Sequence, residues 1–250
     1  MFQLHLSLLD WLAMLWFAVC WLGYTRYSGF HSPRPRKRLQ DALYVHIRAW
    51  IATLHQRDNR IVDTAVITNI ERSATFLASS SLLIIAGIMT ALASTEKVTN
   101  FMSGLPLVTA NHPQRWEIGL LLMLMAFVYA FFTFTWCMRQ WGFASILIGN
   151  TPEKSDERIS SSQRLEHQEA LAHVIWLAIY HFNAGLRAYY FSLALLAWFL
   201  HPIAFMITSS WVVAVLYRRE FHSHTLDALL SANPLAQKDT HPTTPEQDQN

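Results

Sequence analysis

Two groups of polar and charged side chains beside apolar stretches are the strongest candidates for chemistry in this sequence. The first group is Asn59, Arg60, Asp63, Asn69 and Arg72, and the second is Asn183, Arg187 and Tyr190. On a helix, Asn59 and Asp63 are one turn apart. Because Arg187 could pair with Asp63 or Glu71, the two groups could together form one polar site. The alternative is that they anchor helix ends at the level of the lipid headgroups.

Three further candidate residues lie inside apolar stretches. Asp10 lies about one turn inside the first stretch, where an ionisable side chain is either functional or close enough to the end to reach water. Pro202 has no N–H, so it leaves the carbonyl of Trp198 without its helical partner. That carbonyl, beside the imidazole of His201, could coordinate a cation or relay a proton. The alternative is a helix kink with a hydrogen-bonded histidine.

No sequence motif nominates a catalyst, a cofactor or a metal. The chain has no HExxH or Cys-x-x-Cys site, and it has no GxSxG elbow, Walker loop or GxGxxG loop. His222 and His224 form a lone H-x-H pair. Cys20 and Cys137 both lie in apolar stretches, which argues against a disulfide framework. We therefore expect no metal, no cofactor and no enzymatic activity, and a net charge of +2 does not indicate nucleic-acid binding.

The composition is typical of an all-α integral membrane protein. Hydrophobic residues make up 52% of the chain and charged residues 14%, compared with about 25% charged residues in soluble domains. A membrane-spanning helix needs about 20 mostly apolar residues. Four segments meet this requirement, at about 6–24, 74–93, 118–138 and 190–217. The last is long, and we expect one tilted helix with a kink near His201 and Pro202.

Two amphipathic helices are expected to lie in the interface or to pack on protein, at about 38–56 and 165–186. Residues 1–220 would form a single membrane domain. Residues 221–250 would form a polar, disordered tail, because this segment is rich in polar residues and proline. The predicted fold is therefore a bundle of four transmembrane helices with two amphipathic helices.

The distribution of Lys and Arg favours one orientation of this bundle. Nine of the nineteen fall between Arg26 and Arg72, and five fall between Arg139 and Arg187. The positive-inside rule therefore predicts that both termini lie outside, although this leaves Arg218 and Arg219 outside as well. In a five-span alternative, residues 170–186 also cross, which brings the tail inside. We prefer four spans, because the apolar residues of 170–186 lie on one helical face.

Four parts of the sequence together resemble the membrane-protein family of the domain of unknown function 599. They are the Asp10…Trp21-Leu22-Gly23-Tyr24 pattern, the run NRIVDTAVITNIERSATFLAS from Asn59, the aromatic third span ending at Arg139, and the run FNAGLRAYYFSLALLAWF from Phe182. The resemblance covers about residues 8–217. It implies a small, multi-pass inner-membrane protein of bacterial type with about four spans. It implies no activity and supplies no site residues.

The function expected from these features is a small oligomeric channel or transporter for ions or small solutes. Four short spans enclose little space, so a pathway would need several copies around an axis. Asp10, Arg187 and His201 would line or gate it. The alternative is a non-enzymatic membrane scaffold or accessory subunit that docks a protein partner through its two amphipathic helices. In both cases the lipid bilayer is a partner.

Overall fold

The computed structural model describes residues 6–28, 38–94, 113–153 and 155–232, and these residues form helices and no strands. The helices are α1 (Leu8–Ser28), α2 (Leu39–Leu54), α3 (Ile61–Ala93), α5 (Pro113–Gly149), α6 (Ser161–Leu196), α7 (Pro202–Phe221) and α8 (His224–Ser231), with a short 3-10 helix η1 (Ala197–Phe199) after α6. The prediction of an all-α helical bundle is confirmed.

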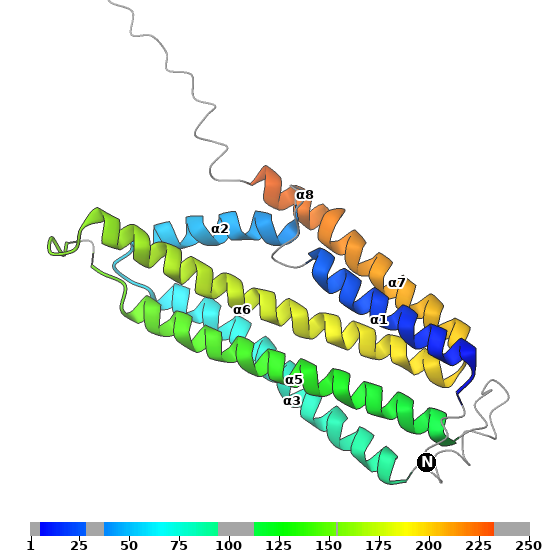
Figure 1. Cartoon of the computed structure of the whole chain (residues 1–250). Coiled ribbons are helices and arrows are strands. Elements are labelled where there is room, and N and C mark those ends of the chain that lie inside the picture. Colours follow the sequence, from blue (N-terminus) through cyan, green and yellow to red (C-terminus); the bar gives the residue numbers. More distant parts are fainter. Residues whose placement is uncertain (1–5, 29–37, 95–112, 154, 233–250) are drawn as a thin grey trace, which may run out of the picture.

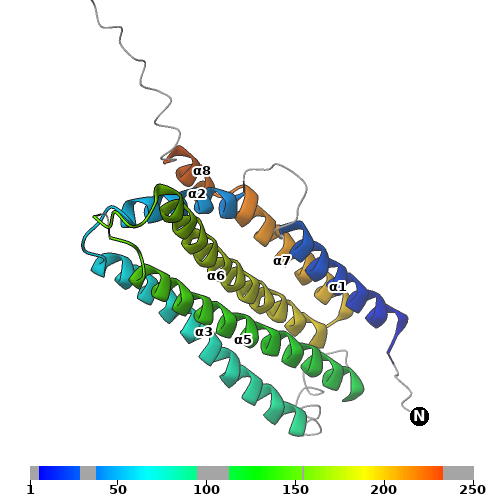
Figure 2. The same ribbon diagram turned by 60° about the vertical axis from the view of Figure 1, so that its left-hand side comes forward.

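Three long helices, α3, α5 and α6, lie side by side and determine the length of the molecule (Figure 1). Helix α5 lies between α3 and α6, and α3 packs mainly on α5. Helices α7 and α1 pack alongside one end of α6. Helix α2 crosses the other end, with α8 beside it (Figure 2). The bundle therefore has two ends of different construction, joined by the three long helices.

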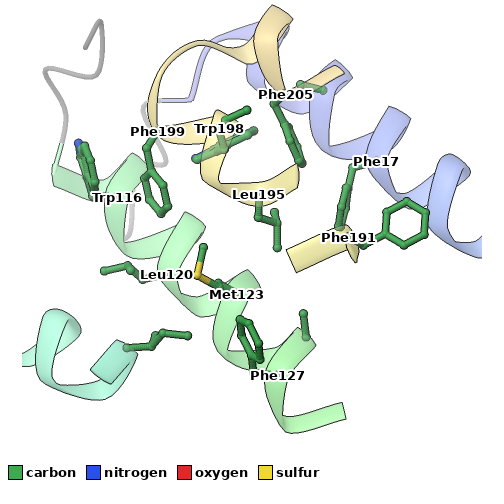
Figure 3. Packing of buried hydrophobic residues seen from close by; sticks show 14 of the residues in the cluster. Phe17, Trp116, Leu120, Met123, Phe127, Phe191, Leu195, Trp198, Phe199 and Phe205 are labelled. Carbon is green, nitrogen blue, oxygen red and sulfur yellow. The ribbon is translucent and has the colours of Figure 1, made fainter. Parts of the chain in front are cut away.

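Each end has its own hydrophobic core. The first core, which we call the α1–α7 cluster, is rich in aromatic residues and includes Phe17, Phe127, Phe191, Trp198 and Phe205 (Figure 3). The second, which we call the α2 cluster, joins α2, α3, α5 and α6 and includes Ile51, Ile67, Trp141, Leu171 and Ile175. A small cluster containing Ala130, Phe134 and Ala188 lies between them. Helices α5 and α6 contribute to all three clusters.

Three of the described helices are long and apolar enough to cross a membrane, namely α1, α3 and residues 114–149 of α5. Helices α3 and α5 contain the spans predicted at 74–93 and 118–138, and α1 contains residues 8–24 of the span predicted at 6–24. Helix α3 has 33 residues, which at about 1.5 Å per residue is about 50 Å. A hydrocarbon core is about 30 Å thick, so α3 is longer than a span needs. Helix α5 is also longer than about 30 Å.

The predicted single kinked helix over 190–217 is wrong. Helix α6 ends at Leu196, η1 and a short turn follow, and α7 begins at Pro202 and runs back alongside α6 (Figure 1). His201 has extended backbone angles, and its Nδ1 accepts a hydrogen bond from the N–H of Ile203 at 3.1 Å. Proline suits the first turn of a helix, where its fixed φ fits and no N–H is needed. Pro202 therefore starts a new helix instead of kinking the old one.

Of the two predicted amphipathic helices, the structure contains one as a separate helix and the other as part of a longer helix. Helix α2 reproduces the prediction at 38–56. The segment 165–186, by contrast, belongs to one continuous helix, α6, which starts with a capping box formed by Ser160 and Gln163. The apolar side of α2, including Ile47, Ile51 and Leu54, is buried in the α2 cluster. The one-sided pattern of α2 thus serves packing within the chain.

The first part of the predicted tail contains a helix, α8. Helix α8 is capped by Ser223, whose Oγ accepts from the N–H of Leu226 at 3.1 Å, and the Leu226 side chain is buried. The carbonyl of Leu229 hydrogen-bonds to Nε2 of His46 on α2 at 2.8 Å. The prediction of disorder is therefore wrong for 224–231, and residues 233–250 lie outside the described part of the chain.

Candidate functional site

The structure does not join the two predicted polar groups into one site. Asp63, in the first group, is 1% exposed. Its Oδ1 accepts hydrogen bonds from Trp50 Nε1 at 2.7 Å and from Arg57 Nη1 at 2.9 Å. The suggested pairing of Asp63 with Arg187 is therefore not formed. The Asp63 carboxylate instead ties the end of α2 to the start of α3.

Arg60 and Asn59 also serve the corner between α2 and α3. Arg60 Nη1 donates to the carbonyl of Thr151 at 3.0 Å, just beyond the end of α5. The last carbonyls of a helix lack partners within that helix, and a cation there also interacts well with the helix dipole. Asn59 Oδ1 accepts from the N–H of Ile61 at 2.9 Å. Both side chains therefore stabilise helix ends.

Asn69 and Arg72 complete the first group and are exposed. Together with Arg60 and four neighbours they line a shallow groove of about 580 Å³, whose other members are Ile61, Thr64, Ala65 and Thr68. Every residue of this groove comes from one side of α3 or from the residue before it. The groove has no second wall from another described helix, so it holds a ligand poorly.

The second predicted group lines a narrower cavity on the side of α6 that faces α1 and α7. This cavity, which we call the Arg187 recess, has a volume of about 160 Å³ and lies where the ends of α1 and α7 meet the start of α2. Its lining residues come from four helices and are Tyr24, Leu39, Gln40, Asn183, Leu186, Arg187, Tyr190, Leu216, Arg219 and Glu220. Asn183, Arg187 and Tyr190 are therefore brought together as the sequence suggested.

Charged groups in the recess keep unused hydrogen-bonding capacity. Arg187 is 5% exposed, and its guanidinium lies 5.8 Å from the centre of the Tyr180 ring. Its Nη2 is buried and has no hydrogen-bond partner among the described residues, and the same is true of Glu220 Oε1. Arg219 Nη1, by contrast, donates to the hydroxyl of Tyr190 at 2.7 Å. The recess can therefore offer both a donor and an acceptor to a ligand.

A second cavity of about 230 Å³ adjoins the recess, and Gln40 lines both. The other lining residues of the second cavity are Ser28, Arg38, Asp41, Tyr44, His173 and Trp176. Arg38 Nε lies 4.0 Å from Asp41 Oδ2. Sequence reasoning missed Gln40, Arg219 and Glu220, because they lie far from Arg187 along the chain. It used the Arg218–Arg219 pair only to assign orientation.

Asp10 and the turn before Pro202 meet at the opposite end of the α1–α7 cluster. Asp10 is 4% exposed, and its Oδ1 lies 3.3 Å from Arg115 Nε. Arg115 Nη2 donates to the carbonyl of Trp198 at 3.0 Å, and Trp198 Nε1 donates to the carbonyl of Arg115 at 3.2 Å. The carbonyl that Pro202 leaves free thus binds a guanidinium of the same chain, while His201 caps α7.

A histidine pair in the α2 cluster region was not foreseen. His55 Nε2 and His167 Nδ1 are 3.1 Å apart, and His55 Nδ1 lies 3.0 Å from the carbonyl of Ile51. Burial lowers the pKa of both imidazoles, and nearby Arg60 lowers both further. The two residues are 112 positions apart, so no local sequence pattern could reveal the contact. Among the described residues, no group of three or more His, Cys, Asp or Glu could hold a metal ion.

Comparison with known proteins gives one match. The model of a family described as a protein of unknown function, DUF599, matches residues 12–225 of this chain. No curated protein and no solved structure matches.

Proposed function

The chain belongs to the DUF599 family, whose function is unknown, and we propose from the geometry that it is a non-enzymatic, membrane-anchored binding protein with five spans. The spans are α1, residues 74–93 of α3, residues 118–138 of α5, residues 183–200 at the end of α6 and through η1, and α7. The α2 cluster lies on the cytoplasmic side of an inner membrane. The Arg187 recess, at the junction of the two parts, is the binding site.

Contacts between α3, α5 and α6 support the proposal that these three helices meet the cytoplasmic surface of the membrane at one level. Thr75 Oγ1 on α3 contacts Met138 Sδ on α5 at 3.1 Å. Four residues before Met138 on α5, Phe134 packs against Gly185 on α6. Large apolar side chains exposed on the proposed membrane part, such as Leu83, Phe132, Ile207 and Trp211, are favourable in contact with lipid and unfavourable in water.

The charge distribution supports the same arrangement. With α6 and α7 as two separate spans, the segments after α7 return to the cytoplasmic side, and Arg218 and Arg219 are no longer exceptions. Of the nineteen Lys and Arg residues, seventeen are then cytoplasmic, and Lys97 and Arg115 are the two outside. This bias agrees with the positive-inside rule better than either arrangement considered from the sequence.

The unpartnered charged atoms in the Arg187 recess carry the proposal of a binding role. A buried charged group without a hydrogen bond costs free energy that a ligand can recover. The interior of the proposed membrane part favours binding over transport through one copy, because aromatic rings fill it. Phe17 contacts Phe191 and Phe205, and Phe205 contacts Trp198.

Labelling of single cysteines tests the proposed arrangement. In a chain whose Cys20 and Cys137 are replaced by serine, we would introduce Glu157→Cys, Leu200→Cys and Ala232→Cys separately and add a membrane-impermeant maleimide to intact cells. We expect labelling of Leu200→Cys in intact cells, and labelling of the other two only after permeabilisation. Labelling of Ala232→Cys in intact cells would place the C-terminal segment outside and contradict five spans.

An oligomeric channel is the second candidate function. The observation that favours it is the position of α3, which packs mainly on α5 and leaves its opposite side exposed, including Leu83 and Met89. A second copy on that side could build a pathway between chains. Light scattering of the purified protein would give the number of copies. Ion flux no greater than that of empty liposomes would remove this candidate.

A further inference from the structure

The Arg187 recess contains one buried donor atom and one buried acceptor atom without a hydrogen bond among the described residues. These atoms are Arg187 Nη2 and Glu220 Oε1. A ligand that carries both a negative and a positive group could serve both. We propose that the recess binds the headgroup of a phospholipid such as phosphatidylethanolamine, with its phosphate on Arg187 and its ammonium on Glu220. This inference rests on the proposed function.

The two side chains are not simply paired with each other. Arg187 and Glu220 interact electrostatically, but none of the ion pairs within 4.0 Å in the described residues joins them. The Glu220 carboxyl group also interacts with the backbone of Gln40, at the start of α2. Arg219 is exposed, and its Nη1 donates to the hydroxyl of Tyr190. Arg187 is therefore the buried cation of the recess with an unpartnered N–H for a phosphate, which guanidinium groups bind well.

The position of the recess suits a lipid headgroup. It lies at the ends of α1 and α7 that carry Arg26 and Arg218, at the cytoplasmic surface of the proposed arrangement. Basic pockets between membrane helices on this side are known to hold lipid headgroups. Its volume of about 160 Å³ corresponds to about five water molecules at roughly 30 Å³ each. The apolar part of its wall includes Leu186 and Leu216.

Native mass spectrometry of the purified full chain in detergent tests this binding. The protein would be incubated with an equimolar mixture of phosphatidylethanolamine and phosphatidylglycerol, and the lipids retained would be counted. The variants are Arg187→Gln and Glu220→Gln. Arg218→Gln is the matched control, because Arg218 is exposed and lies outside the recess.

We expect the wild type and Arg218→Gln to retain phosphatidylethanolamine in preference to phosphatidylglycerol. Arg187→Gln should weaken retention of both lipids by at least about tenfold, which is the effect of one hydrogen bond to a charged group. Glu220→Gln should remove the preference between the two lipids, because phosphatidylglycerol has no ammonium. Equal retention by Arg187→Gln and Arg218→Gln, or no preference in the wild type, would overturn the proposal.

Two further measurements keep the outcome interpretable. Size-exclusion chromatography checks that each variant folds. If Arg187→Gln does not fold, Arg187→Lys replaces it. We expect Arg187→Lys to retain the lipid phosphate, and complete loss of lipid binding in this variant would contradict the assignment. Soluble O-phosphoethanolamine is added as a competitor. Full displacement of lipid at equal concentration would assign the site to a soluble phosphate compound and overturn the lipid assignment. Lipid binding in detergent does not depend on how the protein is oriented in a membrane. An error in the proposed five-span arrangement would therefore appear only in the cysteine labelling, and an error in the lipid site only in the mass spectrometry.

Discussion

Arg115 Nη2 donates a hydrogen bond of 3.0 Å to the carbonyl of Trp198, a residue 83 positions later in the chain. This carbonyl would accept from the N–H of residue 202 in a continuous helix, but residue 202 is a proline. The guanidinium also lies 5.2 Å from the centre of the Trp198 ring and 3.3 Å from Asp10. One arginine thus connects the first turns of α1 and α5 to the turn between α6 and α7.

We predict that Asp10→Asn destabilises the protein strongly. The change leaves Arg115 buried without its countercharge, and breaking a buried ion pair costs about 3 kcal/mol or more. In a chain of this size, the midpoint of thermal unfolding should fall by roughly 6–12 °C. The measurement is thermal unfolding of the purified protein in detergent. Asp156→Asn is the control, because its partner Arg158 is 91% exposed; equal shifts in both variants would contradict the prediction.

Close packing of α5 on α6 makes Gly185 intolerant of a side chain. A Cβ atom there would lie 2.6 Å from the ring of Phe134, whereas a Cβ at Gly142 would have no atom within 4 Å. Gly185→Ala should therefore cost about 1–3 kcal/mol through overpacking. Gly142→Ala should instead stabilise by up to about 1 kcal/mol through helix propensity. Unfolding midpoints of the two variants check this, and a stabilised Gly185→Ala would show that the helices are farther apart.

The histidine pair predicts a loss of stability in mild acid. Burial lowers the pKa of His55 and His167 below the usual 6.5, so below that pH the unfolded chain binds protons that the folded chain does not. Stability should be complete above about pH 6.5 and should fall as the pH drops toward the lowered values. Unfolding midpoints at pH 7.5 and 5.5 measure this. The difference should shrink in His167→Gln and persist in the exposed His222→Gln; an unchanged difference in His167→Gln would exclude the pair as its source.

Arg60 should control the local stability of the end of α5. Arg60→Gln removes charge-assisted hydrogen bonds to carbonyls such as that of Thr151, each worth about 1.5–3 kcal/mol. We expect faster hydrogen exchange in the last turn of α5 and in the residues after it, measured by mass spectrometry. Arg72→Gln changes an exposed arginine on α3, which Arg60 precedes, and should leave this exchange unaltered. Equal effects of the two variants would mean that Arg60 does not cap α5.

Local patterns were sufficient for most helices and for the three residues that α6 contributes as predicted to the candidate site. Periodicity and apolar length predicted α2 and the apolar parts of α1, α3 and α5. Asn183, Arg187 and Tyr190 were grouped correctly because they lie within two turns of one helix. The sequence misled at Pro202, since proline can either kink a helix or begin one, and the choice depends on packing against α1.

Partners distant in sequence could not be predicted. Asp10 was recognised as unusual, but its partner Arg115 lies on another helix. Glu220 joins Arg187 only because α7 runs back along α6. His55 and His167 meet because α2 crosses α6. These contacts depend on the relative placement of helices, which a single sequence does not specify.

The uninterrupted length of α6 has a mechanical consequence. Its 36 residues form a rod of about 54 Å, with one end in the α1–α7 cluster and the other beneath α2. A membrane helix responds to a change in bilayer thickness by changing its tilt. Because α6 has no break, a tilt of its end in the α1–α7 cluster is carried along the whole helix. In the proposed arrangement, a change in the tilt of α6 would therefore displace α2.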